Sequence, residues 1–372
     1  MSEQEPLRSA LYEKHVAAEA KMGQEAGWEV PLVFSGIAEE VRAVRSRAGV
    51  LDISHAGRIR IRGAGAVDLL ERVCTADAVH QEDDTALYTL LCNERGGVID
   101  HGHLLRLADF WVLVCSPPCR GKLLEHLQTV AADFDAQVDD QTGKTSQIAV
   151  TGPAAPELLD KVLPMKVSSL PPLAVRSGSL LIARYIAARI SCSGEWGMEV
   201  ILTSMMASQA WRFITQKAGE SRLPPVGLAA ADVLRIEAGL PRYGCELNET
   251  IDPMTAGLER CVDFDHDFIG RDAVAKIRDK ATARRLVGLV LEVTPSGKPA
   301  TGAIPKQGSA VKQDGVEVGA VTSATYSPTL DKIIAMAYVG RSAGEPGSRL
   351  DVTTGRGDLP AVVKALPFLS PK

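Results

Sequence analysis

Ionisable side chains interrupt an otherwise apolar segment around residue 100. Asp100, His101 and His103 lie in the predicted strand 98–107, directly after the Gly96-Gly97 turn. Burial of a charged group is costly unless the group is paired or used, so these residues are candidates for proton transfer or ligand binding. Successive strand residues point to opposite faces, which places the two imidazoles together and Asp100 on the other face. The alternative is a set of polar groups on a solvent-facing edge.

A metal site is not expected here. His101 and His103 supply two ligands, and no third ligand follows at a suitable spacing. Structural zinc sites need four ligands and catalytic ones need three, so two histidines do not define a metal site.

Strands and helices alternate around this segment. Strands are predicted at 86–92 and 110–115, on either side of 98–107, and a helix is predicted at 66–73. A further strand is predicted at 180–190. A helix is also expected at 36–48, with Ser35 as its cap.

The pattern changes after a charged segment at 276–285. A strand is predicted at 286–293, and the runs 310–313 and 316–320 flank Asp314-Gly315, which is a strong hairpin signal. Alternating helices and strands followed by strands alone indicate an α+β fold with a C-terminal β-domain, either a small barrel or a sandwich.

Composition excludes several classes of protein. The 372 residues include 41 Lys and Arg against 46 Asp and Glu, a formal charge of −5, so nucleic acid is a poor candidate partner. No apolar run approaches the roughly 20 residues of a membrane helix, and the N-terminus resembles neither a signal nor a transit peptide. Seven cysteines without a CxxC spacing fit a reducing compartment. We expect a soluble cytoplasmic protein with no membrane partner.

Nine segments, in order along the chain, carry a family resemblance. They are LYEKHVAAEAKMG from residue 11, GWEVPL at 27–32, EEVRAVRSRAGVLDISHAG at 39–57, ALYTLLCNERGGVID at 86–100, TGP at 151–153, SGEWGMEV at 193–200, GLAAADVLRIEAGLPRYGCELNETIDP at 227–253, DFIGRDA at 267–273 and VTSATYSPTL at 321–330. Over nearly its whole length the chain resembles the aminomethyltransferase, or T protein, of the glycine cleavage system and its tetrahydrofolate-binding relatives.

The resemblance implies a fold and a reaction. The expected fold is α+β, a three-domain ring around a central folate pocket. A discontinuous folate-binding domain would cover 1–50 and 142–275, a second α+β domain with the His101 strand would cover 51–141, and an all-β barrel would cover 284–372. The family moves a one-carbon unit from an aminomethyl-lipoyl arm on a carrier protein to tetrahydrofolate, and ammonia leaves. Tetrahydrofolate and a lipoylated carrier are therefore the expected co-substrate and partner.

Four residues match or approach folate-binding positions of the family. Glu199 matches the glutamate that accepts the adjacent N–H groups of the pterin, and its alternative is an ordinary exposed strand glutamate. Tyr88 matches a tyrosine beside the folate, and its alternative is a core aromatic. Ser54 falls in the loop at the pocket, and Arg235 stands one helical turn after Ala231, where the family usually has an arginine.

The sequence departs from the family at the catalytic position. His101, with Asp100 beside it, occupies the place of the family's aspartate. A neutral imidazole can accept a proton near pH 7, but it does not stabilise a developing cation as a carboxylate does. Ala231, Cys115 and Leu105 are further departures. Two alternatives therefore stay open: a folate-binding protein without transfer activity, and a tetrahydrofolate-dependent demethylase of a small methylated compound.

Two groups of arginines could form a basic patch. They are Arg42, Arg45 and Arg47 on one predicted helix and Arg58, Arg60 and Arg62 on one face of a predicted strand. They are either solvated faces or a surface that docks an acidic carrier.

Overall fold

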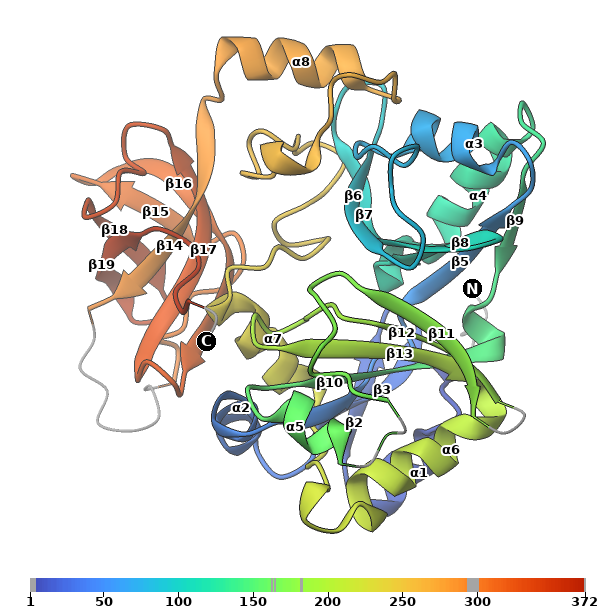
Figure 1. The fold of residues 1–372 in the computed structure, drawn as a ribbon. Coiled ribbons are helices and arrows are strands. Elements are labelled where there is room, and N and C mark those ends of the chain that lie inside the picture. Colours follow the sequence, from blue (N-terminus) through green and yellow to red (C-terminus); the bar gives the residue numbers. More distant parts are fainter. Residues whose placement is uncertain (1–4, 162, 164, 181–182, 293–300, 371–372) are drawn as a thin grey trace. The chain divides into compact units, whose positions relative to one another are not determined.

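The computed structural model describes residues 5–161, 163, 165–180, 183–292 and 301–370 (Figure 1). The chain forms two compact units. Unit 1 comprises the described residues of 1–89 and 101–231, and unit 2 comprises those of 90–100 and 232–371. No helix in these described ranges is both long enough and apolar enough to cross a membrane.

The first sheet of unit 1 is antiparallel, with strand order β11-β12-β13-β10-β4. Its strands are β4 (Gly49–Asp52), β10 (Thr145–Thr151), β11 (Val175–Leu180), β12 (Ala183–Ala188) and β13 (Gly197–Thr203). The strand predicted at 180–190 is confirmed over Ala183–Ala188, which form β12. Leu180 ends β11, and residues 181–182 lie outside the described part of the chain.

The second sheet has strand order β6-β7-β8-β5-β9. Its strands are β5 (Gly57–Arg62), β6 (Ala86–Cys92), β7 (Val98–Leu107), β8 (Phe110–Cys115) and β9 (Gln137–Asp140). The strands predicted at 86–92, 98–107 and 110–115 are confirmed, as is the helix at 66–73, which is α3 (Ala66–Val73). The tip of the β6–β7 hairpin, residues 90–100, belongs to unit 2.

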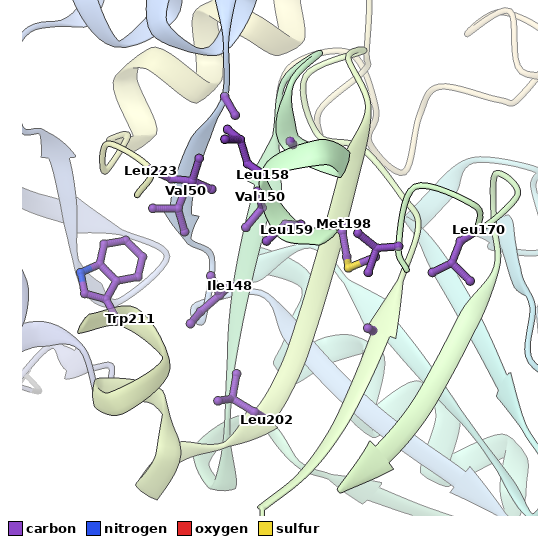
Figure 2. Close-up of a cluster of buried hydrophobic side chains, with 14 of the residues drawn as sticks. Val50, Ile148, Val150, Leu158, Leu159, Leu170, Met198, Leu202, Trp211 and Leu223 are labelled. Carbon is purple, nitrogen blue, oxygen red and sulfur yellow. The ribbon is translucent and has the colours of Figure 1, made fainter. Parts of the chain in front are cut away.

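The two sheets of unit 1 pack face to face. One buried cluster takes side chains from both, namely Ala86, Leu105, Leu107, Val112, Val114, Val175, Ala188, Ile190 and Ile201. On the other face of the first sheet, Ile148, Val150, Met198 and Leu202 pack with side chains that include Trp211 of α6 (Ser204–Arg212) (Figure 2). Burial of each large apolar side chain stabilises the fold by roughly 1.5–3 kcal/mol.

The remaining elements of unit 1 surround these sheets. They are the three strands β1 (Leu7–Arg8), β2 (Lys21–Glu25) and β3 (Trp28–Val33), and the helices α1 (Tyr12–Ala17), α2 (Ile37–Ser46), α4 (Arg120–Ala131) and α5 (Ala155–Asp160). The expected Ser35 cap of α2 is wrong. Gly36 is the N-cap residue, and the buried Glu40 carboxylate accepts the backbone N–H groups of Phe34, Ser35 and Gly36 instead.

Unit 2 contains a closed β-barrel, which decides between the predicted barrel and sandwich in favour of the barrel. The described strands follow the order β14-β17-β16-β15-β18-β19. They are β14 (Arg284–Leu291), β15 (Ala310–Gln313), β16 (Val316–Ser327), β17 (Lys332–Gly340), β18 (Arg349–Thr354) and β19 (Gly357–Lys364). Val293, at the end of the strand predicted at 286–293, lies outside the described residues.

The Asp314-Gly315 hairpin between β15 and β16 is confirmed. Both residues have positive φ, 51° and 79°, as a two-residue hairpin loop of the primed type requires. The helix α8 (Arg271–Lys280) precedes the barrel, and α7 (Leu228–Glu237) begins in unit 1 and ends in unit 2.

Candidate functional site

The layer between the two sheets of unit 1 holds both histidines of β7. His101 and His103 share a face with Leu105, because side chains alternate along a strand and β7 pairs regularly with β8. Leu105 packs in the same buried cluster as Ile201 of β13. His101 and His103 therefore point toward the first sheet.

Tyr88 of β6 contacts both imidazoles. Its phenolic oxygen lies 2.8 Å from His101 Nδ1, and its ring meets His101 and His103 edge-on, with centroids 5.8 and 5.3 Å away. Burial lowers the pKa of His103 to about 4, and burial together with the proximity of His103 lowers the pKa of His101 to about 4. Both rings are therefore neutral near pH 7, and the bond from Nδ1 to Tyr88 leaves His101 Nε2 as the ring nitrogen available for proton exchange.

Glu199 occupies the opposite side of the layer. It lies in β13, the central strand of the first sheet, and pairs with Ala149 of β10 and Ala188 of β12, whose side chains carry no hydrogen-bonding group. It shares a face with Ile201, two residues along the strand, and only 9% of its surface is exposed. The alternative of an exposed strand glutamate is therefore wrong.

Gln147 of β10 is the hydrogen-bond donor to this carboxylate. Its Nε2 lies 2.6 Å from Glu199 Oε2. Burial raises the pKa of Glu199 to about 7, and the Gln147 hydrogen bond acts in the opposite direction by favouring the ionised form. Glu199 is thus a carboxyl group poised between its two protonation states near neutral pH.

Arg58 lies completely buried at the start of β5. Its guanidinium donates to the carbonyl oxygens of Ser54, Ala56, Thr142 and Thr145, at 2.6 to 3.1 Å, and to Thr145 Oγ1 at 2.8 Å. Burial lowers its pKa to about 10, so it remains a cation at neutral pH. Its acceptors lie in the connections from β4 to β5 and from β9 to β10, so one cation joins the two places where the chain passes between the sheets.

Neither of the two interpretations of this strand, a solvated face or a basic patch, holds for Arg58. Arg58 is buried, and Arg60 pairs with Asp139 at 2.8 Å. On the helix, Arg45 pairs with Glu195 at 2.9 Å and is almost buried. The charges of Arg45 and Arg60 are thus each paired with a carboxylate.

Ser54 is buried and contacts Gln147 of β10. Its Oγ accepts the backbone N–H of Gln147 at 3.0 Å, and its own N–H donates to Asp52 Oδ1 at 2.9 Å. It also lines a cavity of about 260 Å³, together with residues that include Trp28 and Arg120. Tyr88, His101 and Glu199 are not among the residues that line this cavity. The expected contact of Ser54 with folate stays a prediction.

Asp100 and Arg235 belong to unit 2. Asp100 is fully buried and lies on the opposite face of β7 from His101. Arg235 pairs with Glu246 at 2.8 Å and with Asp232 at 2.9 Å, and it donates to Ser323 Oγ at 2.7 Å. Its guanidinium is thus held within unit 2. The roles expected for these two residues at the catalytic and folate positions stay predictions.

Gln147 and the role of Arg58 were not predicted from the sequence. One signal was present, since Gln147 is a polar residue directly before the apolar run Ile148–Val150. Its significance depends on Glu199, which lies 52 positions away in the sequence. Across the described ranges, no three His, Cys, Asp or Glu side chains gather in a way that could hold a metal ion.

The two sheets of unit 1 face each other, and the layer between them holds an acid and a base. The same chain also forms a β-barrel. Together these features define a class of mixed α+β proteins with a C-terminal barrel domain. Residues 11–266 match the family model described as the GCVT N-terminal domain, and residues 284–369 match the glycine cleavage T-protein C-terminal barrel domain. The chain therefore belongs to the glycine cleavage T-protein family.

Relatives match along nearly the whole chain. A protein of Thermotoga neapolitana is 35% identical over 362 residues, which cover 97% of each chain, and one of Saccharopolyspora erythraea is 36% identical over 98% of each; both are named aminomethyltransferase. The crystal structure of the glycine cleavage system aminomethyltransferase T from Bartonella henselae has a TM-score of 0.87, 30% identity and 98% coverage of both chains. The α+β fold with a C-terminal barrel is thereby confirmed.

Proposed function

We propose that the protein is a tetrahydrofolate-dependent aminomethyltransferase of the glycine cleavage type. It would take the one-carbon unit from an aminomethyl-lipoyl arm on a carrier protein and transfer it to tetrahydrofolate. The carbon–sulfur bond to the lipoyl arm breaks, the amino group leaves as ammonia, and methylene-tetrahydrofolate and the free lipoyl thiol are the products. Family membership and the names of the relatives support this reaction class.

The buried carboxylate of Glu199 is the observation that carries the proposal. The pterin ring presents adjacent N–H donors, which one carboxylate accepts through its two oxygens. An ionised carboxylate is costly to bury without donors, and the high pKa of Glu199 reflects that cost. Bound pterin would supply the missing donors and hold Glu199 in its charged form.

His101 is proposed as the proton acceptor of the reaction. With a proton on Nδ1 donated to the Tyr88 oxygen, the lone pair of Nε2 is available to the folate amine or to the leaving group. A neutral imidazole gives no charge stabilisation to a cationic intermediate, so we expect transfer to be slower than with a carboxylate at this position. Tyr88 would hold His101 in orientation and line the folate site.

A folate-binding protein without transfer activity is the second candidate. The neutral state of His101 favours it, because the site then lacks the carboxylate expected at position 101. Ammonia release on addition of lipoylated carrier and tetrahydrofolate separates the two candidates. Tight folate binding without ammonia release would favour the second candidate.

The folate assignment is tested with Glu199→Ala and Glu199→Gln. A charged contact is worth about 1.5–3 kcal/mol, so each variant should weaken folate binding at least about tenfold. Glu195→Gln is the matched control, because Glu195 is a buried carboxylate of the same unit that pairs with Arg45. Unchanged affinity in both Glu199 variants would place the folate site elsewhere.

A further inference from the structure

A chain of three side chains leads from the second sheet to Glu199. Arg58 Nη1 donates to Gln147 Oε1 at 3.4 Å, and Gln147 Nε2 donates to Glu199 Oε2 at 2.6 Å. Arg58, Gln147 and Glu199 belong to β5, β10 and β13, and all three are buried. The chain begins at a cation and ends at the carboxyl group proposed to bind the pterin.

We propose that Gln147, oriented by Arg58, is a specificity-determining residue that keeps Glu199 a hydrogen-bond acceptor toward a ligand edge with adjacent N–H donors. This inference rests on the proposed function and names two residues of its site that no family pattern assigned. Arg58 acts through Gln147, so Arg58 is a positioning residue.

The orientation of the Gln147 amide follows from the chemistry of its neighbours. An arginine carries only donors, so the amide oxygen of Gln147 must face Arg58. The amide nitrogen then faces Glu199 and donates to it. If the amide were rotated by half a turn, its oxygen would face a carboxylate oxygen, and only a protonated Glu199 could satisfy that contact.

Arg58 is fixed strongly enough to impose this orientation. Its other donors are bound to four backbone carbonyl oxygens and to Thr145 Oγ1, and the side chain is fully buried. Rotation of the guanidinium would leave several buried carbonyl groups without their donor, which is unfavourable for each of them. The amide of Gln147 therefore meets a rigid cation on one side.

The protonation state of Glu199 determines which hydrogen-bonding pattern a ligand must present. An ionised carboxylate has about four acceptor positions, of which Gln147 fills one on Oε2. The others accept adjacent N–H groups, as on a 2-amino-4-oxo heterocycle or an amidine. A protonated carboxyl would offer an O–H donor and would suit a ligand edge that carries an acceptor. Gln147 thus favours the donor-bearing edge.

The test measures the affinity for 5-formyl-tetrahydrofolate, a folate that resists oxidation, from about pH 6 to about pH 8.5 in Gln147→Leu and Gln147→Glu. Without the Gln147 hydrogen bond, Glu199 binds its proton more tightly, so the midpoint of the affinity profile should move to higher pH in both variants. We expect Gln147→Leu to bind this folate about fivefold to tenfold more weakly than the unsubstituted protein at pH 7. The difference in affinity should shrink to about twofold at about pH 8.5.

Gln81→Leu is the matched control. Gln81 is a buried glutamine of the same unit whose Nε2 donates to the carbonyl oxygens of Thr85 and Leu104. Its substitution should leave the midpoint unchanged, whatever it does to stability. Gln147→Glu keeps a polar side chain of the same length and so remains informative if Gln147→Leu does not fold.

Two different failures are distinguishable. A loss of affinity in the Gln147 variants that is the same at every pH, or no loss, overturns this inference and leaves the folate assignment of Glu199 standing. Full folate affinity in Glu199→Gln overturns the proposed folate site, and this inference with it.

Discussion

The phenolic oxygen of Tyr88 lies 2.8 Å from His101 Nδ1, so Nε2 is the ring nitrogen of His101 that lies outside this contact. The proposed proton-accepting role needs a proton on Nδ1 and a lone pair on Nε2. Nitrogen-15 NMR of the imidazoles at pH 7 should therefore report the Nδ1–H form of His101. Tyr88→Phe should give a mixture of the two tautomers.

The same variant has a kinetic consequence. Mixed tautomers reduce the fraction of molecules ready to accept a proton, so Tyr88→Phe should lower kcat for ammonia release about threefold to tenfold. A His101 that is already protonated on Nε2 in the unsubstituted protein would contradict the assigned role. His103, whose ring lies 5.3 Å from that of Tyr88, serves as the internal reference in the spectrum.

His101→Asp restores the residue type that the family resemblance places at this position. A carboxylate would stabilise the cationic intermediate and could accept a hydrogen bond from Tyr88, so ammonia release should rise at least about tenfold. His103→Asp, which places the same group two residues along the same strand face, is the control and should give no gain. If His101→Asp gives no gain either, another departure such as Ala231 limits the reaction.

The lowered pKa values of His101 and His103 should make the protein sensitive to acid. Folded-state pKa values of about 4, against an ordinary value of 6.5, mean that the unfolded chain binds protons more readily between these limits. The free energy of unfolding therefore falls as the pH drops from about 6.5 toward 4. His103→Asn removes one of the two titrating imidazoles and so removes its share of this fall. Between pH 7 and pH 5 this variant should lose about 2 kcal/mol less than the unsubstituted protein, measured by urea denaturation.

Protonation of Glu199 changes the free energy of unfolding in the opposite direction over the same pH range. Its pKa of about 7 exceeds the ordinary 4.5, so the folded state keeps a proton that the unfolded chain releases, and stability rises as the pH falls from 7 toward 4.5. Glu199→Gln removes this compensation. It should lose more stability than the unsubstituted protein on acidification, whereas a parallel fall in both proteins would mean that Glu199 titrates as an ordinary surface group.

Local patterns were sufficient to predict the elements that carry the histidines. The strands 86–92, 98–107 and 110–115 follow from apolar runs bounded by turn residues, and each boundary depends only on neighbours in sequence. Within the range predicted as one strand at 180–190, Ala183–Ala188 form β12 and Leu180 ends β11, because an apolar pattern does not fix where one strand ends and the next begins.

The role of Arg58 could not be predicted in the same way. The alternation of Arg58, Ile59 and Arg60 indicates a half-exposed strand, and only the fold brings the carbonyl groups of 142–145 to the guanidinium. Gln147 likewise acquires its role from Glu199 on a neighbouring strand. Burial of a polar residue depends on partners distant in sequence, which periodicity does not report.

Arg58 should be one of the most important single residues for the stability of unit 1. Arg58→Met keeps the length of the side chain but removes every donor to the connections at 54–56 and 142–145. Several buried carbonyl groups then lack a partner, and we expect the free energy of unfolding to fall by about 3 kcal/mol or more in urea denaturation. Arg62→Met, on the same strand but about half exposed, should change it by less than about 0.5 kcal/mol. Equal effects of the two substitutions would show that the buried cation does not hold the two connections together.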